Sequence, residues 1–505
     1  MNGDLILTLD IGTSSARALV WDEDGRELEA FRAQIPYAMH TTSDGGVEIE
    51  AEALFVIVAE SLDLVLANLG VRARDIRGVG ISTFWHSVLG IGADGVPLTP
   101  INVWADTRSA RQARALRKRL DEESIHQRTG CRIHPSYYPA KLTWFREMRP
   151  DIFGSVVRWI SPSEYLFSRL FGLGALQVSV CMASGTGFMN QELCAWDTEV
   201  MRLVGVEEDH FSPIVDMNHP FQGLRSEFAG RWGALKGVPF FPAVGDGAGG
   251  NVGSGCVQPA RFAINLGTSG AIRVLWEEGE TPVSYPVPPG CWRYRVDRRR
   301  PLMGAAFSDG GNVFFWLQKA LRLPDLEELE SLLEASEPGA HGLTFLPFLA
   351  GERSMGWNPA SRASLLGMNL DTSPLEIAQA CMEAIAMRFA LASQRLSSVF
   401  PQVQEVIASG GALGKSPAWA QMFADAIGRP ITLAEEAEAS SRGAAVLVRE
   451  VLEGSQYRAW ETRLGRTFVP VEKRHGQYVE MLAQQEWYYQ QVVLAERERQ
   501  EQGED

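Results

Sequence analysis

Short apolar runs alternate with longer segments of helical periodicity along the first part of the chain. The run at residues 5–10 predicts a buried strand, and the run at residues 16–21 predicts its hairpin partner. Apolar side chains then recur at helical spacing through residues 51–69, and Gly70 follows where glycine commonly ends a helix. A further strand is predicted at residues 76–82. The order strand, helix, strand is typical of layered α/β proteins, so we expect an α/β fold.

The second half of the chain continues in the same style. A glycine-rich stretch at residues 304–312 leads into an apolar helix, and residues 375–396 predict a long helix rich in alanine and methionine. A short strand is predicted at residues 406–409 and a helix at residues 416–427, with glycines between them. This half is therefore also expected to place helices against strands.

One tripeptide occurs in matching surroundings in both halves. Gly-Thr-Ser stands at residues 12–14 and again at 267–269, and in both places an apolar strand precedes the turn and another follows it. Asp10 precedes the first turn, and Asn265 takes its place before the second. The repeat indicates a duplicated domain; chance similarity of two glycine-containing hairpins is the alternative. The expected organisation is a domain at residues 1–254, a second at 255–480, and a C-terminal helix with a polar tail at 481–505.

Composition narrows the classes of function. The chain has 505 residues, 45% hydrophobic and 22% charged, which allows large cores and argues against wholesale disorder. Its formal net charge of -15 argues against nucleic acid and anionic membrane as main partners. The six cysteines include no C-x-x-C pair, and there is no basic leader and no uninterrupted apolar stretch of about 18 residues. We therefore expect a cytoplasmic protein with reduced thiols and no membrane span.

The two Gly-Thr-Ser turns are candidates for phosphate binding. Glycine lets the backbone approach a ligand, and hydroxyls together with turn amides can surround an anion. Two such turns on duplicated domains can face each other across a cleft, where the polyphosphate of ATP would fit. The chain has no G-x-x-x-x-G-K-[ST] motif, so this is not a P-loop. The residues predicted to contact the nucleotide here are Gly12, Thr13, Ser14, Ser15, Gly267 and Thr268.

Glycines of the second half extend the predicted nucleotide site. Gly410 and Gly411 stand between a predicted strand and a predicted helix, where an adenosine group can lie on the backbone near a helix N-terminus. Tight packing is the alternative reason for a glycine pair in this position. Lys415 is the next polar contact, and Gly310 and Gly311 of the earlier glycine-rich stretch complete the predicted set.

Two aspartates carry the predicted chemistry. Asp10 ends its strand beside the first turn, where its carboxylate would repel phosphate unless a cation such as Mg²⁺ lies between them; capping of the turn is the alternative. Asp246 stands among small residues that leave the backbone open to a bound molecule, as would also be true of a solvated glycine-rich hinge. A carboxylate there can accept the proton of an attacking hydroxyl, which contributes about 10²–10⁴-fold to the rate. Asp246 is thus the predicted catalytic base and, with Asp10, a predicted metal contact.

These motifs together resemble the FGGY carbohydrate kinases, a family of the actin-like ATPase superfold. Residues 7–15 are similar to the family's first phosphate motif and residues 267–269 to its second. Residues 245–247 stand where the family places its catalytic aspartate, and residues 409–412 resemble its adenosine motif. The resemblance extends from residue 5 to about residue 449. It implies two actin-like (ribonuclease H-like) α/β domains with an interdomain cleft, the sugar mostly on the N-terminal domain and ATP mostly on the C-terminal one.

Within this family the finer pattern is similar to that of gluconate kinases. The supporting stretches are residues 85–88, 104–109, 128–130 with 133–135, 267–273, and 349–353 with 357–359. The resemblance implies phosphorylation of gluconate, and a ketopentose or polyol such as xylulose, ribulose or ribitol is the alternative. Phe84-Trp85 and residues 354–356 depart from the usual pattern near the expected substrate. The departures bear on the choice of sugar and leave the expectation of a kinase intact.

The same resemblance implies that His86 hydrogen-bonds hydroxyls of the substrate. Trp85, whose flat face suits sugar C–H groups, and His134, at the rim of the pocket, are the other predicted substrate contacts. Trp85 is expected either to form a wall of the sugar pocket or to belong to the core, and packing against Trp85 is the alternative role of His86. Glu352 and Arg353 are expected to brace the domain interface rather than to bind the sugar.

Two other classes of function share the superfold. Filament proteins and chaperones hydrolyse ATP without phosphorylating a small molecule, and a sugar sensor binds without catalysis. Trp85, His86 and the glycine-rich loop around Asp246 favour a small-molecule cleft, and the presence of both Asp10 and Asp246 favours an enzyme. The expected partners are therefore a sugar and ATP, not nucleic acid or membrane, and assembly as a homodimer is left open.

Overall fold

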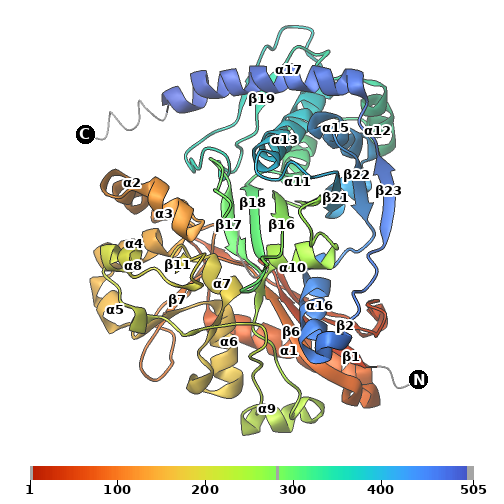
Figure 1. Cartoon of the computed structure of the whole chain (residues 1–505). Coiled ribbons are helices and arrows are strands. Elements are labelled where there is room, and N and C mark those ends of the chain that lie inside the picture. The colour runs from red at the N-terminus through yellow and green to blue at the C-terminus, as the bar shows by residue number, and fades with distance from the viewer. Residues whose placement is uncertain (1–3, 280–283, 497–505) are drawn as a thin grey trace.

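The computed structural model describes residues 4–279 and 284–496, and it confirms the α/β fold (Figure 1). Its first central sheet has the strand order β14-β6-β1-β2-β3. These strands are β14 (Val244–Gly245), β6 (Ile76–Thr83), β1 (Leu5–Ile11), β2 (Ser15–Trp21) and β3 (Ala33–Pro36). The strands expected from the first apolar runs are thus β1, β2 and β6.

The second central sheet repeats the strand pattern of the first. Its order is β17-β18-β16-β15-β21-β22-β23. These strands are β17 (Trp292–Arg295), β18 (Pro301–Phe307), β16 (Gly270–Leu275), β15 (Arg261–Leu266), β21 (Glu405–Ser409), β22 (Ile431–Ala434) and β23 (Leu464–Phe468). In each sheet the first strand of the half pairs antiparallel with its hairpin partner and parallel with a later strand, so Asp10 lies opposite Ser82 and Asn265 opposite Ser409. This shared register agrees with the repeated tripeptide.

Helices from both halves of the sequence cover the first sheet. Helix α1 (Ala51–Leu69) ends at Gly70, as predicted, and packs on β2 and β3. Helix α16 (Ala439–Glu453) comes from the second half, yet it packs on β1 and β6 and against α10 (Asp246–Gly253). The Thr8 and Ser441 hydroxyls meet there at 2.6 Å. The first core is therefore completed by a segment more than 400 residues away in the sequence.

Within the described residues, one helical segment is long and apolar enough to cross a membrane. It is α1 with the turn that follows, Ala51–Asp75. Leu54, Leu62 and Val65 of this helix are buried against the sheet. A core helix of a globular domain has the same composition, so the segment does not indicate a membrane span.

A group of helices between β6 and β14 forms a smaller apolar core beside the first sheet. The helices that contribute to this core are α2 (Ala110–Arg119), α3 (Glu122–Thr129), α4 (Tyr138–Met148), α5 (Pro150–Ser155) and α8 (Thr198–Val204). Helices α6 (Pro162–Phe171) and α7 (Val180–Ser184) of the same region pack in the first core. Figure 1 shows this group on the side of the first sheet away from α16. Residues of these helices contact the segments that form one wall of the pocket described below.

The predicted long helix of the second half is α13 (Pro374–Ser397), which a Ser373–Glu376 capping box begins. It packs with α15 (Pro417–Ile427) and α17 (Glu472–Tyr488), and α17 crosses the top of the molecule in Figure 1. Residues 497–505 of the predicted polar tail lie outside the described residues. All six cysteines are buried and free of disulfides, as expected for reduced thiols.

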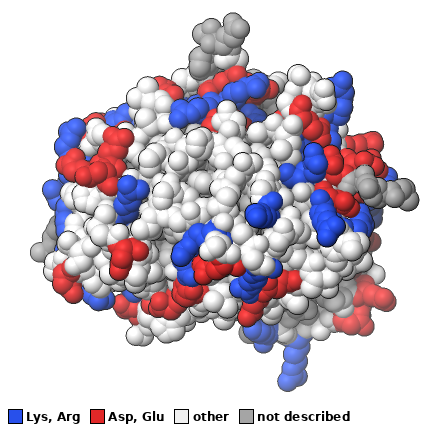
Figure 2. Space-filling view, turned by 90° about the horizontal axis from the view of Figure 1, so that it is seen from below, with Lys and Arg blue, Asp and Glu red and all other residues white. Residues whose placement is uncertain are grey.

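Acidic and basic side chains alternate on the face shown in Figure 2. Lys and Arg stand beside Asp and Glu around a broad uncharged area, and the described residues of this face form no continuous basic patch. Mixed charges of this kind give this face no feature for attracting a polyanion.

Candidate active site

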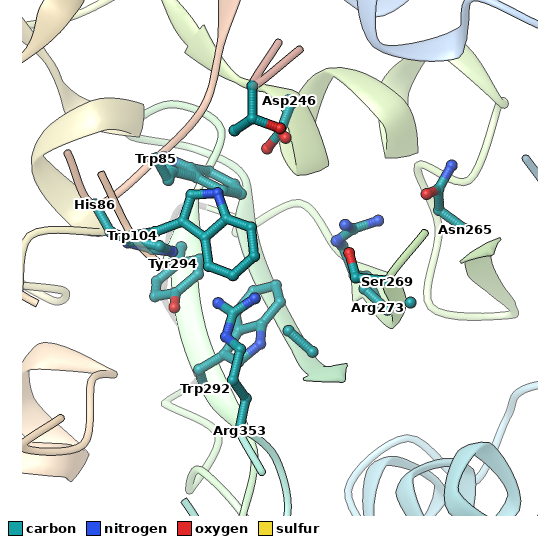
Figure 3. A pocket seen from close by; sticks show the side chains of 14 residues that line it. Trp85, His86, Trp104, Asp246, Asn265, Ser269, Arg273, Trp292, Tyr294 and Arg353 are labelled. Atoms are coloured by element: carbon teal, nitrogen blue, oxygen red, sulfur yellow. The ribbon is translucent and has the colours of Figure 1, made fainter. Parts of the chain in front are cut away.

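A pocket of about 170 Å³ lies between the two central sheets (Figure 3). Thr13 of the first turn and Ser269 of the second both line it, so the two repeated turns face one space. Pockets for drug-sized ligands measure roughly 300–1,000 Å³. This one therefore suits a smaller molecule.

Asp246 is the one carboxylate among the described residues that line this pocket. Strand β14 ends at Gly245 and helix α10 begins with Asp246, whose Oδ1 accepts the next backbone N–H at 2.7 Å. Gly245 has no room for a side chain, because an added Cβ would lie 2.0 Å from the Trp85 ring. The carboxylate is exposed to the pocket, but the surrounding protein keeps water from its other sides, and this desolvation raises its pKa. The charges of two arginines oppose the rise. Such an exposed, poorly solvated carboxylate is suited to accept a proton.

The two arginines, Arg273 and Arg353, were not among the predicted site residues. Arg273 lies on β16 and packs over the start of α10, because a Cβ added to Gly247 would lie 2.8 Å from its Nε. Arg353 reaches the pocket from the loop after β19 (Thr344–Leu346), and its guanidinium lies 4.9 Å from the centre of the Trp104 ring. Trp104 belongs to the first half and Arg353 to the second, so this cation–π contact joins the two halves.

Contacts of the neighbouring residue Glu352 fix the loop that carries Arg353. Glu352 is buried, pairs with Arg388 of α13 at 3.0 Å, and accepts a hydrogen bond from the Tyr489 hydroxyl at 2.7 Å. Burial raises the pKa of Glu352, and Arg388 opposes this effect. Glu352 is thus a structural residue, as expected, although its partners lie within the second half. Arg353 bridges the two halves, as expected, and it also lines the pocket.

Aromatic side chains form one wall of the pocket (Figure 3). Trp85 lies 5.1 Å from Tyr294, which stacks on Trp292 at 4.1 Å between ring centres. The Trp85 indole donates a hydrogen bond to the Cys181 carbonyl at 3.0 Å and is only 5% exposed. Trp85 is thus packed in the core and also lines the pocket, and its contact with a sugar stays a prediction.

His86 lines the pocket in a strained backbone conformation, with φ of 63°. Its Nδ1 lies 2.5 Å from the Gly185 carbonyl, and burial lowers the pKa of the ring well below its usual value, so the imidazole is neutral. Because a carbonyl accepts, Nδ1 carries the proton and Nε2 is left as an acceptor. The ring is therefore prepared to accept a hydrogen bond from a ligand hydroxyl.

His134, the other predicted histidine, is not among the residues that line the pocket. It is buried, with Nδ1 3.1 Å from the Ser136 hydroxyl and its ring 5.2 Å from that of Trp357. The structure thus places His134 in the packing behind the aromatic wall, without direct access to the pocket.

Lys141 ties two pocket segments together from inside the protein. Its buried ammonium donates to the carbonyls of His86 at 2.8 Å, Asn102 at 3.2 Å and Val103 at 2.8 Å. Val103 precedes Trp104, so one side chain holds the strand ends that carry His86 and Trp104. Burial lowers the pKa of this amine to about 7, and Asp106 opposes the effect.

We expect Lys141→Met to raise the KM for the pocket's ligand more than it lowers kcat. The substitution should also destabilise the fold by about 1–3 kcal/mol, because three buried carbonyls lose a donor. The folded pKa lies below the unfolded one, so between pH 7 and 10.5 the unfolded chain binds more protons and the contribution of Lys141 to stability rises with pH. Thermal unfolding from pH 6 to 9 checks this, with exposed Lys236→Met as the control. Parallel pH profiles for wild type and Lys141→Met would contradict it.

Asp10 lies beside the pocket at the end of β1. Burial raises the pKa of its carboxyl to about 6, Arg17 at 3.5 Å opposes the rise, and the charge of Asp246 adds to it. In residues 4–279 and 284–496 no group of three metal-ligating side chains occurs. Mg²⁺ usually takes only one or two carboxylates together with waters and phosphate oxygens. Asp10 and Asp246 therefore fit an ion carried in with a nucleotide.

The first turn has an exposed tip and a buried base. The Gly12 N–H donates to the Ser15 carbonyl at 3.0 Å, which closes the turn. Thr13 and Ser14 are exposed, and Thr13 lines the pocket. Ser15 is buried, and its hydroxyl accepts a hydrogen bond from Gln34 at 3.3 Å. Thr13 and Ser14 are thus the members of this predicted set whose side chains can reach a ligand.

The second turn supports the start of helix α11 (Gly311–Ala320). The Gly311 N–H donates to the Gly267 carbonyl at 2.7 Å, and the following N–H donates to the Thr268 carbonyl at 3.1 Å. A Cβ on Gly310 or Gly311 would lie 2.8 or 2.7 Å from the backbone of this turn. Packing therefore requires both glycines, while Gly267 and Thr268 face open space.

The two glycines after β21 also differ in role, since packing accounts for one and the other is accessible. Gly410 adopts φ of 97°, and a Cβ there would lie 2.5 Å from the Leu266 carbonyl. Gly411 begins the short helix α14 (Gly411–Lys415) and has nothing within 4 Å of an added Cβ. Lys415 is exposed at the other end of this helix. Gly411 and Lys415 are accessible to a nucleotide, whereas packing accounts for Gly410.

A simple pattern could have located part of the missed set. Side chains on a strand alternate between faces, so Ser269, Ala271 and Arg273 share one face of the strand that leaves the second turn. All three line the pocket. Arg353 belongs to the stretch 349–353 that is similar to gluconate kinases, but no strand or helix periodicity there assigns its side chain to the pocket.

Known proteins resemble this chain over nearly its whole length. The sequence model of the N-terminal domain of the FGGY family of carbohydrate kinases matches residues 5–253, and that of the C-terminal domain matches residues 262–448. Gluconokinase of Bacillus subtilis (strain 168) is 28% identical over 453 residues, covering 88% of this chain and 86% of that protein. Xylulose kinase of Staphylococcus xylosus is 24% identical, covering 88% of this chain and 90% of that protein.

Solved structures agree with the fold. The crystal structure of gluconate kinase from Lactobacillus acidophilus superposes with a TM-score of 0.89 at 24% identity, covering 97% of this chain and 98% of that chain. That of Plasmodium falciparum glycerol kinase with ADP has a TM-score of 0.81 at 18% identity, covering 95% and 97%. Since the two family models together span most of the 505 residues, the chain belongs to the FGGY family of carbohydrate kinases, whose co-substrate is ATP.

Proposed function

We propose that the chain transfers the γ-phosphate of ATP to a hydroxyl of gluconate, with Asp246 as the catalytic base. The observation that carries the proposal is the place of Asp246: it is an exposed carboxylate in a small pocket that both Gly-Thr-Ser turns border. The turns supply backbone N–H groups and hydroxyls for the phosphates, and the aromatic wall supplies flat surfaces for sugar C–H groups.

Asp246 would receive the proton of the attacking hydroxyl on Oδ2, since Oδ1 already accepts a backbone N–H. The substrate oxygen then bonds to the γ-phosphorus, the bond to the β–γ bridging oxygen breaks, and ADP leaves. Arg273, beside the start of α10, offsets negative charge at this end of the pocket. Mg²⁺ held by Asp10 and Asp246 would neutralise charge on the phosphates.

His86 would orient the substrate by accepting a hydrogen bond from one of its hydroxyls through Nε2. The Arg353–Trp104 contact would close the pocket between the halves and exclude water, which limits hydrolysis of ATP. In this assignment the catalytic group comes from the first half and one closing group from the second.

Gluconate is the first choice because a relative named as gluconokinase is 28% identical over 88% of this chain, against 24% for a relative named as xylulose kinase. The structure of a xylulose kinase from Lactobacillus acidophilus superposes as well as that of the gluconate kinase, with a TM-score of 0.89 for both, so a ketopentose is the second candidate.

We expect kcat/KM for gluconate to exceed that for xylulose, ribulose, ribitol and glycerol by at least about 10²-fold, because a site built around one substrate's polar groups strongly rejects analogues that leave them unpaired. An assay that couples ADP release to NADH oxidation measures the panel under identical conditions. A ketopentose or glycerol in first place would overturn the choice of gluconate and leave the kinase assignment standing.

A further inference from the structure

We infer that Arg353 binds the carboxylate of a sugar acid, so that the pocket is built for an anionic polyol rather than a neutral sugar. The inference rests on the proposed function and adds the chemical class of the substrate and its direction in the pocket. Among the described lining residues the charged ones are Asp246, Arg273 and Arg353. His86 is neutral there. The lining thus carries one positive charge in excess.

The excess charge is located at Arg353. Arg273, whose Nε is likewise buried without a hydrogen-bond partner, packs over the start of α10, where the carboxylate of Asp246 is its main opposite charge. Arg353 lies at the other end of the pocket from Asp246 (Figure 3). Asp10 is beside the pocket, where Arg17 lies 3.5 Å from it and pairs more closely with Glu438 at 2.6 Å.

No described residue satisfies the guanidinium of Arg353. Within residues 4–279 and 284–496 no carboxylate oxygen lies within 4.0 Å of it, and its Nε is buried without a hydrogen-bond partner. Arg353 as a whole is only partly buried, but its Nε is buried, and buried polar groups are normally paired. A ligand carboxylate would supply the missing acceptors, and the flat guanidinium can bind it through two parallel hydrogen bonds.

Arg353 is also fixed in place before any ligand arrives. Its guanidinium stacks on Trp104, and the preceding Glu352 is held by its buried ion pair. On the other side, Ser354 N–H donates to the Ala306 carbonyl at 3.0 Å, and its hydroxyl accepts the Ala306 N–H at 3.0 Å. A side chain ordered in this way loses little entropy on binding, which is typical of a recognition residue and not of a mobile surface arginine.

The separation of Arg353 and Asp246 sets the direction of the substrate. With the carboxylate on Arg353, the far end of a six-carbon chain points toward Asp246. The hydroxyl to be phosphorylated is then the one most distant from the carboxylate. A neutral ketopentose offers Arg353 hydroxyl and carbonyl acceptors but no opposite charge, which disfavours the second candidate.

The test compares gluconate with glucitol, which has the same carbon chain with CH₂OH in place of the carboxylate. Calorimetry on the full-length protein without ATP measures the affinity of both for wild type, Arg353→Met, Arg353→Lys and the exposed control Arg298→Met. Methionine keeps an apolar stem against Trp104. We expect Arg353→Met to weaken gluconate roughly 10- to 100-fold, Arg353→Lys to restore part of the loss, and glucitol to change less than about twofold.

Equal losses for gluconate and glucitol in Arg353→Met would overturn the inference, since they would indicate a purely structural role. So would wild-type protein that binds both compounds equally well. Phosphoryl transfer, measured in parallel, separates the two proposals: transfer to gluconate with an unchanged KM in Arg353→Met refutes the carboxylate site and leaves the function. Selective binding of gluconate by wild type without transfer refutes the function and leaves the site.

Discussion

Asp246→Asn is expected to lower kcat for phosphoryl transfer by about 10²–10⁴-fold, while the affinities for sugar and ATP stay close to those of the wild type. Asparagine has the same shape, and its carbonyl oxygen can still accept the backbone N–H that Oδ1 accepts at 2.7 Å. It cannot take up the proton of the attacking hydroxyl. The loss should therefore appear in kcat and not in substrate binding, which single-turnover kinetics with parallel calorimetry can separate.

Asp121→Asn is the matched control for this substitution. Asp121 also stands at a helix start, where its carboxylate accepts the Ser124 N–H at 3.1 Å, but it does not line the pocket. It tests whether amidation of a helix-capping aspartate is harmful in itself. Unchanged turnover in Asp246→Asn would remove Asp246 from the catalytic role, and equal losses in both variants would assign its effect to the fold.

Local sequence patterns were sufficient for the parts of the fold that depend on neighbouring residues. Strands β1, β2 and β6 and helices α1 and α13 follow from apolar spacing, with glycine or a capping box at their ends. The repeated turn predicted two related sheets. Binding of phosphate by a turn requires glycine and hydroxyl residues at particular positions, so the same tripeptide appears in both halves. These signals lie within a few residues of the features that they specify.

The parts that the sequence did not reveal depend on residues far apart in the chain. Arg353 reaches the pocket because Glu352 is held by α13 and by Tyr489, more than 130 residues further along. His134 matches the family pattern, yet the fold places it behind the wall that Trp85 and Tyr294 help to form. The positions of these two side chains have no local cause, so periodicity and motif spacing do not predict them.

The contact of α10 with α16 is another such long-range feature, and it controls the position of Asp246. Gly443 of α16 meets Gly249 of α10 so closely that an added Cβ on Gly443 would lie 1.9 Å from the Gly249 carbonyl oxygen. An added Cβ on Gly253 would likewise lie 1.9 Å from the Ala439 carbonyl oxygen. The two helices therefore cross through glycine, and α10 begins with Asp246.

Gly443→Ala is expected to destabilise the protein by about 1–3 kcal/mol and to lower kcat by about 10²-fold. The new methyl group meets rigid backbone rather than a flexible side chain, so the helices must separate. That movement shifts Asp246, and a misplacement of about 1 Å is enough for such a loss of rate. Alanine also favours a helix over glycine by about 1 kcal/mol, so a fall in stability would report the clash alone. Thermal unfolding and steady-state kinetics measure the two effects.

Gly250→Ala is the control for Gly443→Ala. Gly250 is next to Gly249 on α10, but its added Cβ would meet only the Ser440 hydroxyl oxygen at 3.6 Å, an ordinary contact. The same change from glycine to alanine on the partner helix should leave kcat near the wild-type value and stability equal or higher, by up to about 1 kcal/mol. If Gly443→Ala behaved like Gly250→Ala, the helix crossing would have room to adjust. The position of Asp246 would then depend on the Trp85–Gly245 packing instead, where an added Cβ would lie 2.0 Å from the ring.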